Sequence, residues 1–232
     1  MPSERTFDII IIGAGPAGLS TALHLIKIAP QLAEKILILE KARHPRPKLC
    51  AGGLTVDAEV LLERLGLDVN EVPCAWAESV CIQFEGRGLR LHPSQRPALR
   101  IIRRDEFDSW LANKVRQSGV EILEDVLVKA VRLVDGEVIV GTSAGEFQAR
   151  VVVGADGSNG VVRGNILPDH PLQTARLLEV ICSLDANSRH LSNTAYFDFF
   201  CVPNGIAGYS WDFPTQLQGQ AMRGWGIFDN TL

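Results

Sequence analysis

The chain has 232 residues, of which 46% are hydrophobic and 22% are charged. This composition supplies one sizeable core, or one domain and part of another, and it excludes an intrinsically disordered chain. The formal net charge of −4 gives neither a basic footprint for nucleic acid nor a polybasic membrane anchor. We therefore expect no nucleic-acid partner.

The cysteines and the apolar runs indicate the compartment. There are five cysteines, an odd number, and no two form a CxxC pair. This argues against a disulfide framework and a metal site, and favours a reducing compartment. The apolar run at residues 9–12 is too short for a signal peptide, and no run approaches the ~20 residues that span a bilayer. We expect a cytoplasmic protein without a transmembrane segment, and peripheral membrane contact stays open.

The first elements in chain order predict a βαβ unit. Residues 8–13 form a continuous β-branched run, typical of a strand covered on both faces. A glycine-rich turn at 13–18 leads into a helix over about 16–28, which Pro30 ends. Residues 36–40 are expected to be the second buried strand.

The middle of the chain mixes helices and strands. An irregular loop over 44–53 precedes a helix at about 56–65, with Gly66 as its C-terminal cap. Residues 79–84 and 89–92 alternate like an antiparallel pair joined at 86–88, and a helix over 105–117 ends at Gly119. Strands are expected at 120–123, 126–133, 137–140 and 147–153, with a hairpin turn at Asp135-Gly136.

The pattern of predicted elements changes after Pro168. Strands are expected at 177–184, 196–202, 208–213 and 222–228, and no helix is evident there. The sequence thus predicts an α/β domain over 1–74 and 99–168, with β-rich material inserted at 75–98 and following at 169–232.

The strongest motif is Gly13-x-Gly15-x-x-Gly18, which follows a strand, opens a helix and precedes Glu40 by 40 − 18 = 22 residues. Gly13 permits the tight turn, Gly15 lets a pyrophosphate approach the backbone, and Gly18 lets the helix pack closely. Glu40 can accept hydrogen bonds from both ribose hydroxyls, which favours an unphosphorylated adenosine ribose. The pattern predicts an adenine dinucleotide site. A glycine-rich turn with a surface glutamate would leave the spacing unexplained.

A second motif is Gly154-Ala155-Asp156-Gly157, which follows the apolar run 151–153. An Asp-Gly pair is common in ordinary turns, so the motif alone leaves that interpretation open. Its place behind the glycine fingerprint favours a binding role.

With these motifs the chain resembles the aromatic-hydroxylase-like superfamily of FAD-dependent oxidoreductases. The resemblance implies FAD at the first site, in a Rossmann-like domain of glutathione-reductase type. Residues 104–111 resemble the superfamily's Arg-x-x-Phe-Asp-x-x-Leu helix, in which the arginine reaches the FAD phosphates. A helix-start salt bridge is the alternative for this arginine. Gly160 stands where the DG motif usually has a serine. The implied FAD contacts of this part are Gly13, Gly15, Pro16, Ala17, Gly18, Glu40, Lys41, Arg104, Val126, Asp156 and Gly157.

Two further matches make the chain most similar to the geranylgeranyl reductase family. Residues 47–53 resemble its Pro-x-Lys-x-Cys-x-Gly loop, which lies beside the flavin and implies contacts from Lys48, Cys50, Ala51 and Gly52. Residues 209–214 resemble its Tyr-x-Trp-x-Phe-Pro motif at the substrate cavity, which implies substrate contacts from Trp211 and Phe213. Cys50 and Tyr209 are the candidate catalytic residues. The alternatives are that Cys50 is a buried filler and that the two aromatic residues are sheet core.

The resemblance implies NAD(P)H-driven reduction of prenyl double bonds through FAD, on a small apolar substrate such as a prenyl lipid. A flavin monooxygenase of the same superfamily is one alternative. The other is a non-catalytic nucleotide-binding remnant, because family members contain a later Gly-Asp-x-x-Gly segment that is absent here. We therefore expect a truncated antiparallel β-rich substrate domain and a missing C-terminal half.

Overall fold

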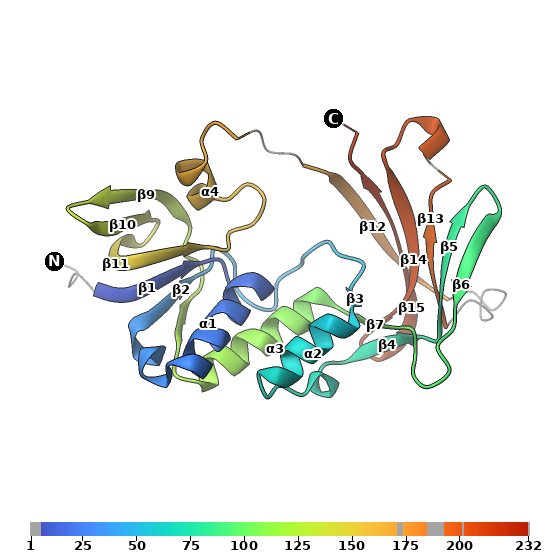
Figure 1. Cartoon of the computed structure of the whole chain (residues 1–232), viewed down its shortest axis with the longest axis horizontal. Helices are drawn as coiled ribbons and strands as arrows, with labels where there is room; N and C mark the ends of the chain where they lie inside the picture. The colour runs from blue at the N-terminus through green and yellow to red at the C-terminus, as the bar shows by residue number, and fades with distance from the viewer. Residues whose placement is uncertain (1–5, 171–173, 185–192, 201, 232) are drawn as a thin grey trace. The chain divides into compact units, whose positions relative to one another are not determined.

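The computed structural model describes residues 6–170, 174–184, 193–200 and 202–231. The chain forms two compact units (Figure 1). Unit 1 comprises Met1–Arg46 and Asp108–Leu172, and unit 2 comprises Pro47–Phe107 and Gln173–Leu232. These divisions place residues 47–74 and 99–107 with the β-rich part of the chain, whereas the sequence interpretation grouped them with the α/β domain.

Unit 1 is built on a six-stranded sheet with the order β8-β2-β1-β11-β10-β9. The strands are β1 (Thr6–Ile12), β2 (Ile36–Leu39), β8 (Glu121–Leu123), β9 (Val128–Val134), β10 (Glu137–Thr142) and β11 (Gly145–Gly154). The pairs β8–β2, β2–β1 and β1–β11 are parallel, and β10 and β9 extend the sheet antiparallel. Figure 1 shows β1 and β2 side by side near the N-terminus. The expected α/β fold is confirmed.

Local sequence signals explain where helix α1 of unit 1 begins, but they did not predict helix α4. Helix α1 (Pro16–Ile28) has Gly15 at its N-cap and a proline in its first turn, where the missing amide costs nothing. It buries Leu19, Ala22 and Leu23. The short helix α4 (Val161–Ile166) was not expected from the sequence, because six residues show no helical periodicity.

The core of unit 1 forms around the parallel strands. All four residues of β2 are buried, as a strand covered on both faces requires. Ile10 and Leu37 from neighbouring strands pack in one cluster with Val140 of β10 and Ala149 of β11. The carboxyl ends of β1, β2 and β11 therefore meet at one rigid edge.

Unit 2 contains a second six-stranded sheet with the order β12-β15-β14-β13-β5-β6. Its strands are β5 (Ser79–Phe84), β6 (Arg87–Leu91), β12 (Arg176–Ser183), β13 (Thr194–Asp198), β14 (Gly208–Leu217) and β15 (Gln220–Asp229). All neighbours are antiparallel except β13 and β5, which run parallel. The expectation of an antiparallel sheet is wrong for this pair. No hairpin connects these two strands, so nothing fixes them in opposite directions.

A small sheet of β3 (Gly53–Leu54), β7 (Leu99–Ile102) and β4 (Cys74–Ala77) completes unit 2, together with α2 (Val56–Arg64). These strands have two to four residues, too few to show alternation. The Thr55 hydroxyl caps α2 by accepting from the amide of Ala58, and Gly66 follows with φ +78°. The helix α3 (Arg104–Gln117) begins in unit 2 and continues into unit 1.

Element bounds differ from the sequence prediction at the β5–β6 turn and at both ends of β13. The β5–β6 turn lies at Glu85-Gly86, one residue before the predicted 86–88. The strand expected at 196–202 is β13 at Thr194–Asp198, followed by a short 3-10 turn at Val202–Asn204, and Cys201 lies outside the described residues. In the described ranges, no helix is long and apolar enough to cross a membrane.

Candidate functional site: a dinucleotide cradle and a Cys50 cavity

The glycine-rich turn of unit 1 lies tightly against the turn that follows β11. Gly13 has φ +106°, and a Cβ on it would lie 2.3 Å from the carbonyl oxygen of Ala155. A Cβ on Gly18 would lie 1.9 Å from the carbonyl oxygen of Gly13. Neither position therefore accepts a side chain, which explains two of the three glycines through packing alone.

Gly15 differs from Gly13 and Gly18 because a Cβ there would have room: it would meet only one atom within 4 Å and no backbone. The nearest atom to a Cβ there is a guanidinium nitrogen of Arg46, at 3.5 Å. Pro16 and Ala17 follow as the first residues of α1, and Ala17 is exposed. The turn thus presents backbone and a helix N-terminus to a free space beside a cation, an arrangement that suits a phosphate.

Glu40, at the end of β2, is 4% exposed. Its Oε2 accepts from the amide of Ala14 at 2.8 Å, and its Oε1 accepts from the amide of Ala42 at 3.1 Å. The amide of Val126 donates to the Glu40 carbonyl at 2.9 Å, so Val126 lies next to this acid. Lys41 is exposed. Each carboxylate oxygen keeps a lone pair for a ribose hydroxyl.

Arg46 is a site residue that the sequence analysis did not identify. Its Nε lies 3.6 Å from Oε1 of Glu40 and its Nη2 lies 3.5 Å from Oδ2 of Asp108. Its side chain is only 14% exposed, and its buried Nε has no hydrogen-bond partner. A buried unpaired donor is costly, so this guanidinium is suited to receive an anion. The basic loop after the acid was its only sequence signal.

His44 and Glu124 form a second group beneath the turn. The Nδ1 of His44 lies 2.7 Å from Oε1 of Glu124, and its Nε2 lies 3.1 Å from the carbonyl oxygen of Ala14. Arg116 also contacts Oε1 of Glu124 at 2.7 Å. Burial acts to raise the pKa of Glu124, but hydrogen bonds from His44 and Arg116 outweigh it and the pKa lies below its usual range. These contacts hold the backbone of the glycine-rich turn at Ala14.

Asp156 lies in the turn after β11, where its Oδ2 accepts from the amide of Val162 at 3.3 Å. A Cβ at Gly160 would lie 2.2 Å from the Asp156 carboxylate. The glycine in place of the usual serine therefore makes room for the carboxylate against the start of α4. Gly157 has φ +87° with nothing near it.

The residues of the Pro-x-Lys-x-Cys-x-Gly loop line a cavity of about 410 Å³ in unit 2, which we call the Cys50 cavity. Gly52 holds the loop on β7: the amide of Ile102 donates to its carbonyl at 2.9 Å, and a Cβ there would lie 2.0 Å from the Ile102 carbonyl oxygen. The lining residues are Pro47, Lys48, Leu49, Cys50, Ala51, Ile102, Arg103, Arg104, Asp105, Glu179, Ile181, Thr215 and Gly224. Glu179 was not expected from the sequence.

The aromatic residues of β14 lie elsewhere in unit 2. Trp211 and Phe213 are both 2% exposed and pack in a core cluster with Ile101 and Ala195. Tyr209 stacks on Phe228 with ring centroids 5.6 Å apart. The structure therefore does not bring Tyr209 and Cys50 together in the Cys50 cavity.

Strand register places one set of apolar side chains on a single face of the unit 2 sheet, because paired residues share a face. We call this the apolar face. Its members are Val80, Ile82, Phe84, Leu89, Leu91, Leu177, Ile181, Ala195, Phe197, Tyr209, Trp211, Phe213 and Phe228. The small sheet covers the middle of this face, where Leu99 and Ile101 join the core cluster.

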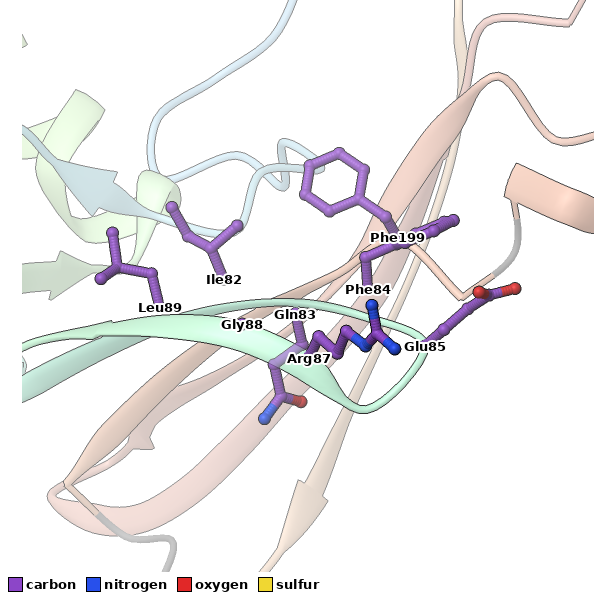
Figure 2. Close-up of a pocket in the computed structure, with 8 residues that line it drawn as sticks. All are labelled: Ile82, Gln83, Phe84, Glu85, Arg87, Gly88, Leu89 and Phe199. Atoms are coloured by element: carbon purple, nitrogen blue, oxygen red, sulfur yellow. The ribbon is translucent and has the colours of Figure 1, made fainter.

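The far end of the apolar face is open at the β5–β6 hairpin. Ile82, Phe84 and Leu89 are exposed there and line a pocket of about 640 Å³ with Phe199. Figure 2 shows these four side chains on one side of the hairpin ribbon and Gln83 on the other. Unit 2 thus offers an extended apolar surface.

A parallel sheet with a glycine turn, a helix N-terminus and a buried acid at its carboxyl edge defines the dinucleotide-binding class of α/β fold. The sequence profile of the family described as an FAD binding domain matches residues 6–195. The chain belongs to this family of FAD-dependent oxidoreductases. In the described ranges, no three His, Cys, Asp or Glu residues are grouped as a metal site.

Two relatives and one solved structure illustrate the likeness. The chain is 30% identical over 216 residues to an uncharacterised protein of Methanosarcina barkeri, covering 92% of this chain and 52% of the relative. It is 29% identical over 227 residues to digeranylgeranylglycerophospholipid reductase 1 of Methanopyrus kandleri, covering 90% and 54%. A geranylgeranyl bacteriochlorophyll reductase-like protein of Thermoplasma acidophilum shares the fold, with a TM-score of 0.77, 21% identity and coverage of 97% and 57%.

The chain spans about half the length of these curated relatives. The residues of unit 1 fit the ADP half of FAD: the open space at Gly15 and the unpaired Nε of Arg46 suit the diphosphate, and Glu40 suits the ribose. This fit rests on two observations: there is room beside Gly15, and the buried Nε of Arg46 has no hydrogen-bond partner. A bound diphosphate would fill the first and accept a hydrogen bond from the second.

Proposed function

We propose that this chain is the FAD-binding part of a reductase that saturates prenyl double bonds with electrons from NADH or NADPH. The observation that carries the FAD site is the unpaired Nε of Arg46 beside the open face of Gly15 and the buried carboxylate of Glu40. Support for the prenyl substrate comes from the digeranylgeranylglycerophospholipid reductase among the relatives and from the apolar face.

In this proposal the residues of unit 1 bind the ADP half of FAD. Gly13, Gly15 and Gly18 shape the turn, and Pro16 and Ala17 begin the helix that faces the diphosphate. Glu40 accepts from the ribose, with Lys41 beside it, and the Val126 backbone faces the adenine. Asp156 and Gly157 close the site next to the glycine turn, where Gly13 already contacts Ala155.

In this proposal the residues of unit 2 contact the flavin and the substrate. Lys48, Cys50 and Ala51 line the Cys50 cavity and would face the flavin, and Gly52 fixes their loop. Arg104 also lines this cavity and would reach the FAD phosphates. When bound, FAD would supply two-electron transfer between the nicotinamide donor and the substrate. The chain's own residues orient the partners and exclude water. Trp211 and Phe213 are buried in the core cluster, so in this proposal they would support the apolar substrate surface at the β5–β6 hairpin from within unit 2 and would not form its wall.

The proposal also covers the arrangement of the chain and its location. We propose an FAD-binding domain over 1–74 and 99–168 and a substrate domain over 75–98 and 169–232. The exposed apolar side chains of the β5–β6 hairpin support contact with a lipid surface in the cytoplasm. Cys50 and Tyr209 stay candidates for catalysis.

The test is an anaerobic turnover assay. The FAD-loaded chain is mixed with NADH or NADPH and a geranylgeranyl lipid, and product mass is followed. A gain of two hydrogens per double bond supports the proposal. Oxygen-dependent hydroxylation in an aerobic parallel would instead indicate a monooxygenase, and bound FAD without any turnover would indicate a non-catalytic nucleotide-binding chain.

A further inference from the structure

Glu179 lies in the middle of β12 on the apolar face. It pairs with Gly226 of β15, between Leu177 opposite Phe228 and Ile181 opposite Gly224. Among the described strand residues whose register puts them on this face, only Arg87, at the β5–β6 turn, and Glu179 carry a charge. Glu179 is half-buried, and a carboxylate among apolar side chains loses part of its hydration, so its place on this face needs an explanation.

The carboxyl group of Glu179 faces the Cys50 cavity. Its Oε1 lies 3.8 Å from the position of a Cβ on Gly224, another residue that lines this cavity. The backbone amide of Cys50 donates a hydrogen bond to it. The other charged or titratable groups that line this cavity are Lys48, Arg103, Arg104, Asp105 and the Cys50 thiol.

None of these groups neutralises Glu179 in a close ion pair. Glu179 forms no salt bridge among the described residues, and Arg103 instead contacts Asp105 at 2.7 Å. Desolvation by burial raises the pKa of Glu179, and the Cys50 amide and the charge of Arg103 only partly oppose this rise. Glu179 is therefore a carboxyl that holds its proton more firmly than an exposed glutamate, at the wall of a cavity.

We propose that Glu179 is a catalytic proton donor of the Cys50 cavity, which protonates one carbon of the substrate's double bond. The inference rests on the proposed reductase function. The π bond would break and two C–H bonds would form: FAD, when bound and reduced, would supply a hydride to the other carbon and be oxidised by two electrons. Glu179 is left as a carboxylate and recovers its proton from water.

Glu179 is better placed for this role than the two residues that the sequence suggested. Tyr209 packs against Phe228, Phe197 and Phe199 in the aromatic part of the apolar face and does not line the Cys50 cavity. Cys50 lines it, but a thiol is in general a weaker acid than a carboxyl. The Cys50 backbone instead positions Glu179 through its amide.

The first test needs no cofactor. The chain is labelled with ¹³C at glutamate side-chain carboxyls and titrated by NMR, and Glu179→Gln identifies the resonance by its loss. Glu85→Gln, at the exposed hairpin turn, is the control for the assignment. We expect Glu179 to titrate above the ordinary glutamate value of about 4.3. A titration at or below that value would overturn the proposal, since the group would have no proton to give.

The second test uses the FAD-loaded chain in a single turnover with a geranylgeranyl lipid. We expect Glu179→Gln to keep wild-type flavin reduction by NAD(P)H and to slow saturation of the double bond at least ~100-fold. Glu179→Asp should restore part of the rate and shift the pH profile, which a purely structural role would not do. Equal thermal unfolding of both variants checks the fold.

The outcomes separate the two proposals. Wild-type saturation rates and an unchanged pH profile in Glu179→Gln would overturn the role of Glu179 and leave the reductase standing. A wild-type chain that binds FAD and saturates nothing would overturn the reductase, and with it the role of Glu179, whatever the NMR titration gives.

Discussion

The backbone amide of Ala14 donates to Oε2 of Glu40 at 2.8 Å. This bond joins the glycine-rich turn after β1 to the acid at the end of β2, 26 residues later. The acid therefore shapes the turn that is proposed to face the diphosphate, in addition to its proposed contact with the ribose. A change at Glu40 is expected to affect both parts of the FAD site.

Replacing Glu40 with glutamine should weaken FAD binding by about ten- to hundredfold. Glutamine has one acceptor oxygen, so it cannot accept from Ala14 and Ala42 and also from two ribose hydroxyls, and a lost bond to a charged acceptor costs about 1.5–3 kcal/mol. Fluorescence titration with FAD measures the loss. Glu137→Gln, in the β9–β10 hairpin, is the control, and an equal affinity for both variants would remove Glu40 from the site.

Arg46→Met should lower FAD affinity and reduce its dependence on salt, because a cation facing the diphosphate would be lost. It should also lower folding stability, because the buried carboxylates of Glu40 and Asp108 lose the guanidinium that lies 3.6 and 3.5 Å from them. Arg43→Met removes an exposed arginine that pairs with Asp125 at 2.7 Å and should leave FAD affinity unchanged. Titrations at two salt concentrations compare them. A salt response of Arg46→Met identical to the wild type would contradict the assignment.

Gly13→Ala should destabilise unit 1 by about 3 kcal/mol or more, because the new methyl group combines a positive φ with a collision against the Ala155 carbonyl. Gly136→Ala is the matched control: it also has positive φ, at +85°, but nothing lies within 4 Å of its Cβ. It should cost only about 1 kcal/mol. Urea unfolding of both variants separates collision from backbone strain, and equal losses would refute the close approach.

Acid should destabilise unit 1 partly through Glu124. The pKa of its carboxyl is lowered in the folded chain, so its ionised form stabilises folding above the unfolded value of about 4.3, and this stabilisation is lost as the pH falls through the folded value. Glu124→Gln should therefore be less stable than the wild type at pH 7 and approach it near pH 3. Urea unfolding at several pH values measures the gap; a gap that stays constant would show that no linked proton is involved.

Gly226→Ala should destabilise unit 2 by about 3 kcal/mol, because a Cβ there would lie 2.1 Å from the indole ring of Trp211. Gly224→Ala, two residues earlier on the same face, meets its nearest atom at 3.7 Å and should be tolerated. Thermal unfolding compares them. Equal melting temperatures would mean that Trp211 does not lie over Gly226.

The sequence predicted unit 1 well because its signals are local. The glycine spacing, the continuous apolar run at 9–12 and the proline at the start of α1 each act within a few residues, and α1 was predicted at its observed bounds of Pro16–Ile28. The sequence also indicated Glu40, since the distance from Gly18 to the end of the next strand is set by the length of one helix and one strand.

The remaining features depend on contacts between distant segments. The parallel pairing of β13 with β5 joins residues more than a hundred positions apart, which no local pattern encodes. Glu179 looks like one polar residue in a strand until register places it opposite Gly226 and below the Cys50 loop. Arg46 is identified as a candidate site residue by its buried Nε, which has no hydrogen-bond partner in the structure.

The most direct measurement is the visible absorption spectrum of the 232-residue chain after incubation with FAD and removal of free FAD by desalting. The account predicts retained flavin absorbance in the wild type and in Arg43→Met, and its loss in Glu40→Arg, in Arg46→Met and in Gly15→Ala, whose methyl group would enter the space for the diphosphate. A wild-type chain that retains no flavin, or variants that all retain it equally, would contradict an FAD site built from these residues.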